Sequence, residues 1–369
     1  MNARIAPTTE PPTPSTSADA QDGQQGFGSR LVQTLLTNRV ALLVILLVVV
    51  VALLMRLGQA GYLSAAYSPD YMSAALINLV PLAMLALAEM VVIISGGGGI
   101  DLSLGSIVSL VGMGFGFMYG IWGWPLALSI VLAVVAGALL GAVNGVLIAR
   151  FGFPPLIATL ATYYGYWSLA LVSNNQKPIS SPPIQDLYGL SKAVEIPLIG
   201  QQLPLLPKGI VIFLLPTVVI VGLLLAKMTY GRRLYAIGTN DVAGAWSGVD
   251  VVRTRAMSYV ISGAIAGLVA VVNVSQFASA RPDAGTSGNG MALPAITIAV
   301  LGGVAVTGGA GRTSGVVLAT LLVVWLNAGI LLAFSGNTGS QVELLALGLI
   351  LVGSALLNTF TARKYSGAR

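Results

Sequence analysis

The chain has 369 residues, of which 56% are hydrophobic and only 8% are charged, whereas about one quarter of the residues in an ordinary soluble domain are charged. This composition excludes a soluble globular domain and predicts an integral membrane protein. Histidine and cysteine are absent from the sequence, which rules out disulfides and removes the usual zinc, haem and iron–sulfur ligands, thiol nucleophiles and the histidine base of hydrolytic triads. The sequence therefore predicts no metal site and no catalytic residue.

The formal net charge of +6 arises from 18 basic and 12 acidic residues. Nucleic-acid binding would require a basic patch interleaved with aromatic side chains, but the basic residues are scattered at the ends of apolar runs. Membrane topology explains them better, and no nucleic-acid partner is expected.

Residues 1–29 are rich in Pro, Ser, Thr and Gln and contain almost no large apolar side chains, so they cannot bury enough surface to fold. We expect a disordered cytoplasmic tail followed by one transmembrane domain over residues 30–369. The first apolar run, 40–55, precedes a stretch at 58–60 that resembles a signal-peptidase site. An uncleaved helix is favoured, because a long polar tail is unlike the start of a signal peptide.

Crossing the hydrocarbon of a bilayer takes roughly 20 apolar residues in a helix. Runs of about this length predict an all-α, polytopic bundle of about ten transmembrane helices with discontinuous glycine-rich segments. The runs are residues 40–55, 72–94, 102–120, 125–149, 155–173, 209–227, 256–276, 292–310, 314–334 and 341–358.

The basic residues indicate how the bundle is oriented. With the N-terminus inside, 13 of the 18 basic residues fall on the cytoplasmic side and 5 on the outer side. Lys and Arg concentrate in the cytoplasmic loops of membrane proteins. Both termini are therefore predicted to be cytoplasmic.

The stretch "SGGGGIDLS", residues 95–103, interrupts two long apolar runs. Neither it nor a second glycine-rich stretch at 301–315 contains the G-x-x-x-x-G-K-[ST] pattern of a phosphate-binding loop, so the chain is not expected to bind ATP itself. Consecutive glycines break a helix, and the freed backbone groups then need protein or water around them. The favoured interpretation is a tight turn capped by a polar side chain at the next helix start. The alternative is a discontinuous helix that borders a translocation path. The candidate residues are Gly96, Gly97, Gly98, Gly99, Asp101 and Ser103.

Several polar residues lie within the apolar runs. Glu89 is the carboxylate placed well inside one of them, and such groups usually face a cavity or pair within the bundle. It is either part of the translocation path or a buried structural group, and both interpretations stay open. Four amides are interpreted as hydrogen-bonding groups between helices. They are Asn144, Asn273, Gln276 and Asn327.

Small residues also predict contacts between helices. Gly137, Gly141 and Gly145 are spaced four apart and fall on one helix face, as do Gly116 and Gly120. Missing side chains on one face let a neighbouring backbone approach closely. Tight helix packing is therefore expected at both places.

Two longer hydrophilic segments connect the apolar runs. The outer one, residues 173–208, carries prolines and amphipathic pieces and is predicted to lie at the periplasmic surface with some helix over 185–193. The inner one, residues 227–255, is the longest cytoplasmic connection. It is the best candidate for docking another protein.

The inner segment contains the signals of a short surface helix. Asparagine and aspartate at 240 and 241 are strong N-cap types, and a glycine at 248 is a natural stop. Small residues between them would let the helix seat closely in a partner. The alternative is a solvated loop held to anionic lipid by the flanking arginines. The candidate docking residues are Asn240, Asp241, Ala243, Gly244 and Gly248.

These motifs are similar to those of a known family. The segment "SGGGGIDLSLGS" resembles the signature of the membrane permease subunits of bacterial ATP-binding-cassette sugar importers, the ribose/xylose/arabinose-type family that includes autoinducer-2 permeases. The similarity continues through "NGVLIARFGFPPLIATLAT", "GRRLYAIGTNDVAGAWSGVDV" and "AVLGGVAVTGGAGRTSG". It covers most of residues 40–358.

The resemblance implies a division of labour among separate chains. This chain would be a permease subunit of the bacterial inner membrane, with no ATPase site and no cofactor of its own. Together with a second permease subunit it would enclose the translocation path for a sugar, or for autoinducer-2, an inositol or a nucleoside. A cytoplasmic ATPase subunit carrying ATP and magnesium would dock on residues 227–255, and a periplasmic binding protein would deliver the substrate.

Two other classes compete with this one. A secondary transporter driven by protons or sodium would use Glu89 and Asp101 to carry the coupling ion. A membrane scaffold or sensor would not transport at all. A sensor is expected to carry a soluble output domain, and none is predicted here.

Overall fold

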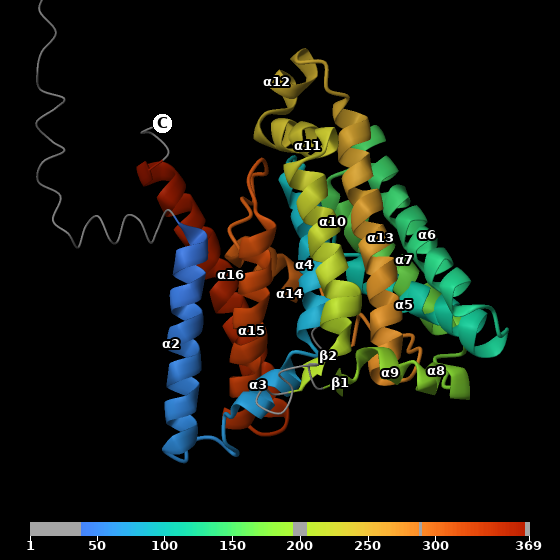
Figure 1. The fold of residues 1–369 in the computed structure, drawn as a ribbon. Coiled ribbons are helices and arrows are strands. Elements are labelled where there is room, and N and C mark those ends of the chain that lie inside the picture. The colour runs from blue at the N-terminus through green and yellow to red at the C-terminus, as the bar shows by residue number, and fades with distance from the viewer. Residues whose placement is uncertain (1–37, 195–204, 288–289, 366–369) are drawn as a thin grey trace, which may run out of the picture.

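The computed structural model of the chain describes residues 38–194, 205–287 and 290–365, and within these ranges it is mostly helical (Figure 1). The predicted tail, residues 1–29, lies outside the described residues, as do residues 195–204 of the outer segment. The all-α class predicted from the sequence is confirmed.

The helices follow one another through short connections. In chain order they are α2 (Arg39–Gln59), α3 (Pro69–Ala75), α4 (Leu79–Ile94), α5 (Leu104–Phe115), α6 (Leu126–Gly145), α7 (Pro155–Ser173), α8 (Pro182–Asp186), α9 (Tyr188–Ser191), α10 (Leu215–Ala226), α11 (Thr229–Thr239), α12 (Asp241–Trp246), α13 (Val251–Phe277), α14 (Ala292–Leu301), α15 (Thr313–Ala333) and α16 (Asn337–Tyr365). The π-helical segments are η1 (Gly116–Ile121) and η2 (Val146–Arg150), which extend α5 and α6, and η3 (Ile210–Leu214), which precedes α10. Two short strands, β1 (Ala193–Val194) and β2 (Leu206–Pro207), pair antiparallel.

Most of the predicted apolar runs form membrane-length helices. Within the described residues, six helices are long and apolar enough to cross a membrane, or up to eight if each bent pair is one span. The bent pairs are α3 with α4, at 49°, and the η3–α10 helix with α11, at 68°. The remaining two predicted runs correspond to α7, with 19 residues, and α14, with 10. A polytopic helical bundle is confirmed, and the count of about ten spans stays a prediction.

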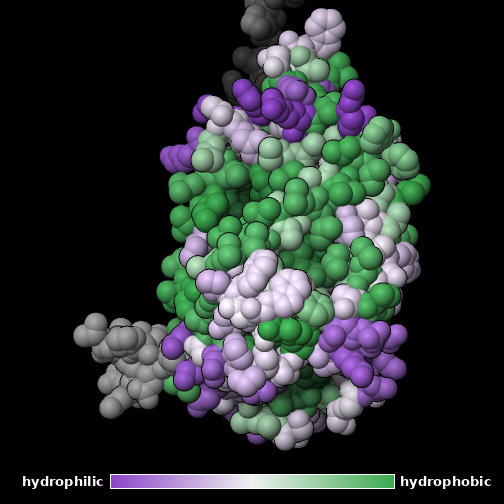
Figure 2. Space-filling view, turned by 90° about the vertical axis from the view of Figure 1, so that its right-hand side faces the viewer, coloured by the Kyte–Doolittle hydropathy of each residue, from purple (hydrophilic) through white to green (hydrophobic). Residues whose placement is uncertain are grey.

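The two ends of the bundle carry different elements. In Figure 1, α11 and α12 lie at one end, whereas α3, α8, α9 and the β1–β2 pair lie at the other. The start of α2 and the end of α16 lie toward the α11–α12 end. Figure 2 shows a broad hydrophobic band between hydrophilic ends. This is the surface pattern of a multi-pass membrane protein.

Helix α4 lies at the centre of the bundle. Every residue of α4 except Leu82 is buried, and α13, α14 and α15 all pack against it. The outer helices instead expose large apolar side chains, such as Val48 on α2, Leu139 on α6 and Ile220 on α10. The outer surface is therefore suited to lipid, and the interior is a packed helical core.

The tightest helix pair is α6 against α13, and glycines on both sides make it possible. A Cβ added to Gly137 would lie 2.8 Å from Gly267 Cα, and one on Gly263 would lie 2.9 Å from Gly141 Cα. A Cβ on Gly145 would lie 2.6 Å from the Ala256 carbonyl oxygen. The packing predicted from the spacing of glycines in α6 is confirmed. Its partner, the glycine face of α13, was not predicted.

We expect Gly141→Ala to destabilise the folded protein. The new methyl group would run into the Tyr259 carbonyl, so α6 and α13 must separate, and overpacking of this kind typically costs about 1–3 kcal/mol. The measurement is the thermal unfolding midpoint of the detergent-solubilised protein.

Gly165→Ala on α7 is the matched control. Gly165 has nothing within 4 Å of an added Cβ, and alanine is the better helix former by roughly 0.5–1 kcal/mol. Its midpoint should stay level or rise. Equal midpoints for the two variants would mean that the α6–α13 contact is not tight in the folded protein.

Candidate functional site

The glycine-rich break is a sharp turn directly after α4. Gly96, Gly97 and Gly98 have φ values of 73°, 63° and 70°, a left-handed conformation that residues with a side chain rarely adopt. The turn folds the chain back onto α4, where the Asp101 N–H donates to the Glu89 carboxylate at 3.3 Å. The two carboxylates discussed from the sequence therefore lie side by side.

The Asp101 carboxylate organises the start of α5. It accepts hydrogen bonds from the Ser103 N–H at 3.0 Å and from the Ser103 hydroxyl at 2.6 Å. Helix α5 begins at Leu104, and Ser103, its N-cap residue, makes no capping bond with its own side chain. The Ser103 hydroxyl instead donates to Asp101 and accepts from Asn144. The expected polar turn is present, with the Asp101 carboxylate accepting from the Ser103 N–H directly ahead of the helix.

Asn144 connects this turn to two further helices. Its amide donates to the Ser103 hydroxyl at 2.8 Å and to Asp101 at 3.3 Å, and its oxygen accepts from the Thr162 hydroxyl on α7 at 2.7 Å. The prediction that Asn144 links helices is confirmed. We call Glu89, Asp101, Ser103, Asn144 and Thr162 the buried polar network.

Burial makes the hydrogen bonds of this network costly to lose. Glu89, Asp101, Ser103 and Asn144 are all 0% exposed. One oxygen of each carboxylate has no hydrogen-bond partner among the described residues. The other oxygen of Glu89 binds the Asp101 N–H, the other oxygen of Asp101 binds Ser103 and Asn144, and Asn144 binds Thr162. These bonds connect α4, α5, α6 and α7. Their placement favours the structural interpretation of Glu89.

A second feature brings three distant glycine segments together at the α11–α12 end. A Cβ on Gly96 would lie 2.9 Å from Gly238 Cα, one on Gly308 would lie 2.5 Å from Gly96 Cα, and one on Gly238 would lie 2.5 Å from the Gly309 nitrogen. The Gly309 N–H also donates to the Ile94 carbonyl at 3.0 Å. We call Gly96, Gly238, Gly308 and Gly309 the glycine junction. The glycine-rich stretches were visible in the sequence, but their meeting with α11 was not.

The inner segment folds as two helices. Helix α12 follows the predicted signals, since the Asn240 side chain accepts from the Ala243 N–H at 3.0 Å and Gly248 has a φ of 79°. Helix α11 was not predicted. The Asp241 carboxylate forms an ion pair with Arg255 at 2.7 Å, and Arg255 also donates to the Ser95 carbonyl at 3.2 Å. Helix α12 is thereby tied to both α13 and the glycine-rich break.

The outer face of α12 presents an apolar pair. Trp246 is 87% exposed and Val242 is 65% exposed, and they lie four residues apart on the helix. Ala243 is also exposed, but Gly244 is buried, with Ile237 of α11 3.2 Å from an added Cβ. Gly244 is therefore small because α12 packs on α11, and the side chain most available to a partner is Trp246, which the sequence analysis did not select.

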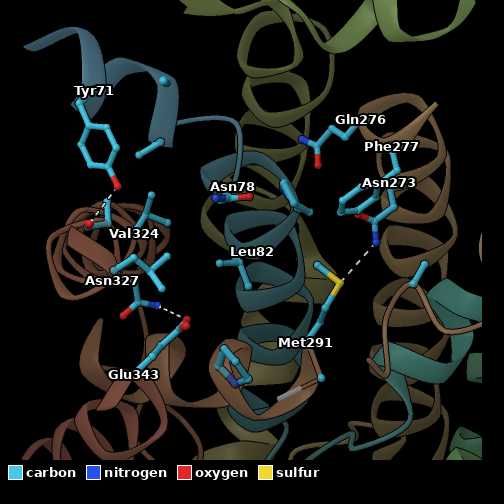
Figure 3. A pocket seen from close by; sticks show the side chains of 18 residues that line it. Tyr71, Asn78, Leu82, Asn273, Gln276, Phe277, Met291, Val324, Asn327 and Glu343 are labelled. Atoms are coloured by element: carbon cyan, nitrogen blue, oxygen red, sulfur yellow. Dashed lines mark hydrogen bonds between the residues drawn. The ribbon is translucent and has the colours of Figure 1, made fainter. Parts of the chain in front are cut away.

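A cavity of about 500 Å³, lined by both polar and apolar side chains, lies between α3, α4, α13, α14, α15 and α16 (Figure 3). Its polar lining side chains are Tyr71, Asn78, Asn273, Gln276, Asn327 and Glu343. The Asn327 amide donates to Glu343 at 2.6 Å, and the Gln276 amide donates to the Ile77 carbonyl at 2.8 Å. Three of the amides interpreted as links between helices therefore also line a cavity.

The chemistry of this lining is neutral hydrogen bonding. No Lys or Arg lies among the described residues that line it, and Glu343 is its one ionisable acid. Side-chain amides and a phenol can donate to and accept from hydroxyl groups. Neither Glu89 nor Asp101 is among the lining residues. A signal was available in the sequence, because amides recur within three apolar runs.

Comparison with known proteins agrees with this architecture. Residues 71–355 match the family described as branched-chain amino acid transport system / permease component. The chain belongs to this family of transport permease components, and the resemblance seen in its motifs is confirmed.

Individual relatives are named as importer permeases. The chain is 34% identical over 280 residues to the "Autoinducer 2 import system permease protein LsrD" of Yersinia enterocolitica, covering 76% of this chain and 82% of the relative. The proteins of the same name from Yersinia pseudotuberculosis and Yersinia pestis are also 34% identical, over 76% of this chain and 81% of each relative. No solved structure matches the chain.

We expect Asp101→Ala to lower the thermal unfolding midpoint. The substitution leaves the Ser103 N–H and hydroxyl without their acceptor in a fully buried place, and each buried polar group left unsatisfied costs about 1–3 kcal/mol. Asp186→Ala removes an exposed carboxylate from α8 and serves as the control. If both variants unfold at the wild-type temperature, the buried polar network does not stabilise the fold.

Proposed function

We propose that this chain is the permease subunit of an ATP-binding-cassette importer and forms the translocation path for a neutral, polyhydroxylated solute, namely a sugar or autoinducer-2. The observation that carries the proposal is the amide-lined cavity. Its lining residues come from six helices and offer hydrogen bonds without a basic side chain. The relatives named as autoinducer-2 import permeases support the same class of solute.

The lack of a basic group in the cavity narrows the solute class. The family description names branched-chain amino acids, whose carboxylate is bound most strongly by a basic side chain, and no Lys or Arg lies among the described residues of the lining. Hydroxyl groups need only the amides and the phenol that the cavity provides. A neutral solute therefore fits better than an amino acid.

The proposal includes the partners that such a subunit requires. An ATPase subunit with ATP and magnesium would dock on residues 227–255 at the cytoplasmic end, so both termini would be cytoplasmic. A periplasmic binding protein would deliver the solute to the end formed by residues 173–208. A second permease subunit would complete the path, and this chain would hold no ATPase site of its own.

Helix α12 supports the docking part of the proposal. It lies at the end of the molecule (Figure 1), and it exposes an aromatic side chain beside an aliphatic one. Exposed Trp side chains commonly anchor protein interfaces. A groove in the ATPase would cover this pair.

The test is uptake by proteoliposomes that contain the permease with its ATPase and solute-binding protein. We expect uptake of ribose or autoinducer-2 to require ATP and to continue when ion gradients are collapsed. Uptake that an ion gradient drives without ATP, or transport of leucine in preference to either solute, would contradict the proposal.

A cavity variant uses the same preparation. Asn327→Leu should lower uptake about tenfold, because it removes hydrogen bonds worth roughly 0.5–1.5 kcal/mol each and leaves the Glu343 carboxylate unpaired. Asn174→Leu is the control, since this partly exposed asparagine lies outside the cavity lining and its side-chain amide donates to the nearby Lys177 carbonyl. Equal uptake by both variants would show that the solute passes elsewhere.

Docking is tested with Trp246→Ser. The side chain is 87% exposed, so its loss should leave the unfolding midpoint unchanged while it weakens co-purification of the ATPase by about tenfold or more, as expected for a Trp anchor. Trp122→Ser is the control, because it removes another exposed Trp, 59% exposed and located after η1. It should leave co-purification of the ATPase unchanged. Unchanged ATPase binding by Trp246→Ser would exclude α12 as the anchor.

A further inference from the structure

We propose that Arg255 and the glycine junction form the joint that passes movement of α12 to the helices lining the cavity. This inference rests on the proposed function, because it assigns the route by which a docked ATPase would act on the path. In this role Arg255 does not contact the solute; it is a positioning residue that holds α12 against the glycine-rich break.

Arg255 joins the neighbouring helices α12 and α13 to the glycine-rich break, which lies 160 residues earlier in the sequence. It belongs to α13, and one of its terminal nitrogens lies 2.7 Å from both carboxylate oxygens of Asp241, the first residue of α12. The same nitrogen donates to the Ser95 carbonyl at 3.2 Å, and the guanidinium carbon lies 3.0 Å from a Cβ placed on Gly97. One side chain therefore holds the docking helix and the glycine-rich break together.

The environment of this ion pair makes it more than a loose surface contact. The Arg255 side chain is 15% exposed and that of Asp241 is 43% exposed. Exposed ion pairs contribute little to stability. A partly buried guanidinium, however, has already lost much of its hydration, and losing its carboxylate partner would leave that cost uncompensated. The pair is therefore expected to stay formed while α12 is pushed or pulled.

The glycine junction makes the second connection, between backbones. It joins the end of α4, the end of α11 and the loop between α14 and α15, with glycines at each contact. The Gly309 N–H donates to the Ile94 carbonyl at 3.0 Å, and the Tyr235 hydroxyl on α11 donates to the Gly311 carbonyl at 2.8 Å. Without side chains between them, the three segments have no rotamers that could absorb a displacement.

The connected segments lead directly to the cavity. Helix α4 contributes Leu82 to the lining, α14 contributes Pro294, and α15 contributes Asn327. A single residue, Asn240, separates α11 from α12, so the two helices move together. Displacement of α12 therefore moves the inner ends of three lining helices at once.

The test compares three variants in proteoliposomes that contain the complete complex. Arg255→Gln and Asp241→Asn break the ion pair, and Arg253→Gln removes the same charge from an exposed position two residues away. The readout is the number of solute molecules taken up per ATP hydrolysed. We expect this ratio to fall about fivefold or more in the first two variants, as loss of a typical coupling between sites would cause.

Several readouts separate a joint from a merely structural role. ATPase co-purification and the rate of ATP hydrolysis should stay close to wild type in Arg255→Gln, whose native side chain is only 15% exposed, and Arg253→Gln should keep the wild-type ratio. Arg255→Lys should recover part of the ratio, because an ammonium group keeps the charge but not the fork of donors. Loss of ATPase binding in Arg255→Gln would instead assign Arg255 to docking and would overturn the inference.

Gly238→Ala tests the backbone contact separately. Its methyl group would lie 2.5 Å from the Gly309 nitrogen, so the junction must open and the ratio should fall as in Arg255→Gln. Gly222→Ala on α10 is the control, because the nearest atom to its added Cβ is 3.8 Å away. Wild-type ratios in Arg255→Gln, Asp241→Asn and Gly238→Ala overturn the inference, whereas a wild-type complex without ATP-driven uptake overturns the proposed function itself.

Discussion

Direct contact between backbones is the constraint on which this structure depends. Within a membrane the hydrophobic effect does not hold helices together, so association relies on close packing and on hydrogen bonds between them. The α6–α13 pair and the glycine junction both meet this condition by placing glycines where another backbone must pass. The first contact builds the bundle, and the second joins the bundle to α11 at the α11–α12 end.

Polar groups inside the bundle fall into two sets with different surroundings. The buried polar network is closed, since most of its donors and acceptors bind one another and four of its members are 0% exposed. The cavity set instead lines a space of about 500 Å³. The first set holds helices in place, whereas the second has hydrogen-bonding groups to offer a passing solute.

Much of this arrangement could be predicted because its causes are local. Apolar runs predicted the helices, the glycine spacing in α6 predicted a close neighbour, and Asn240 with Gly248 predicted α12. These features depend on residues within a few turns of one another. The same kind of reasoning predicted a polar turn at Asp101, whose carboxylate accepts from the Ser103 N–H ahead of α5.

The remaining features depend on contacts between distant segments. The sequence analysis selected Glu89 and Asp101 as candidates for the path, but the cavity lies among amides that looked like links between helices. Which polar residue faces a cavity depends on how each helix is rotated about its axis in the bundle. The spacing of apolar and polar residues in the sequence does not determine that rotation. Gly244 is a similar case, because only the packing of α12 on α11 shows that it faces inward.

The composition of the cavity lining also has an electrical consequence. Moving one elementary charge across a membrane is worth about 2.3 kcal/mol per 100 mV, so a charged solute would add or consume that energy in every cycle. A lining that contains no Lys or Arg among its described residues suits a solute with no charge to move. For the neutral solute proposed above, translocation would be electrically silent, and the work of each cycle would depend on the concentration ratio of the solute alone.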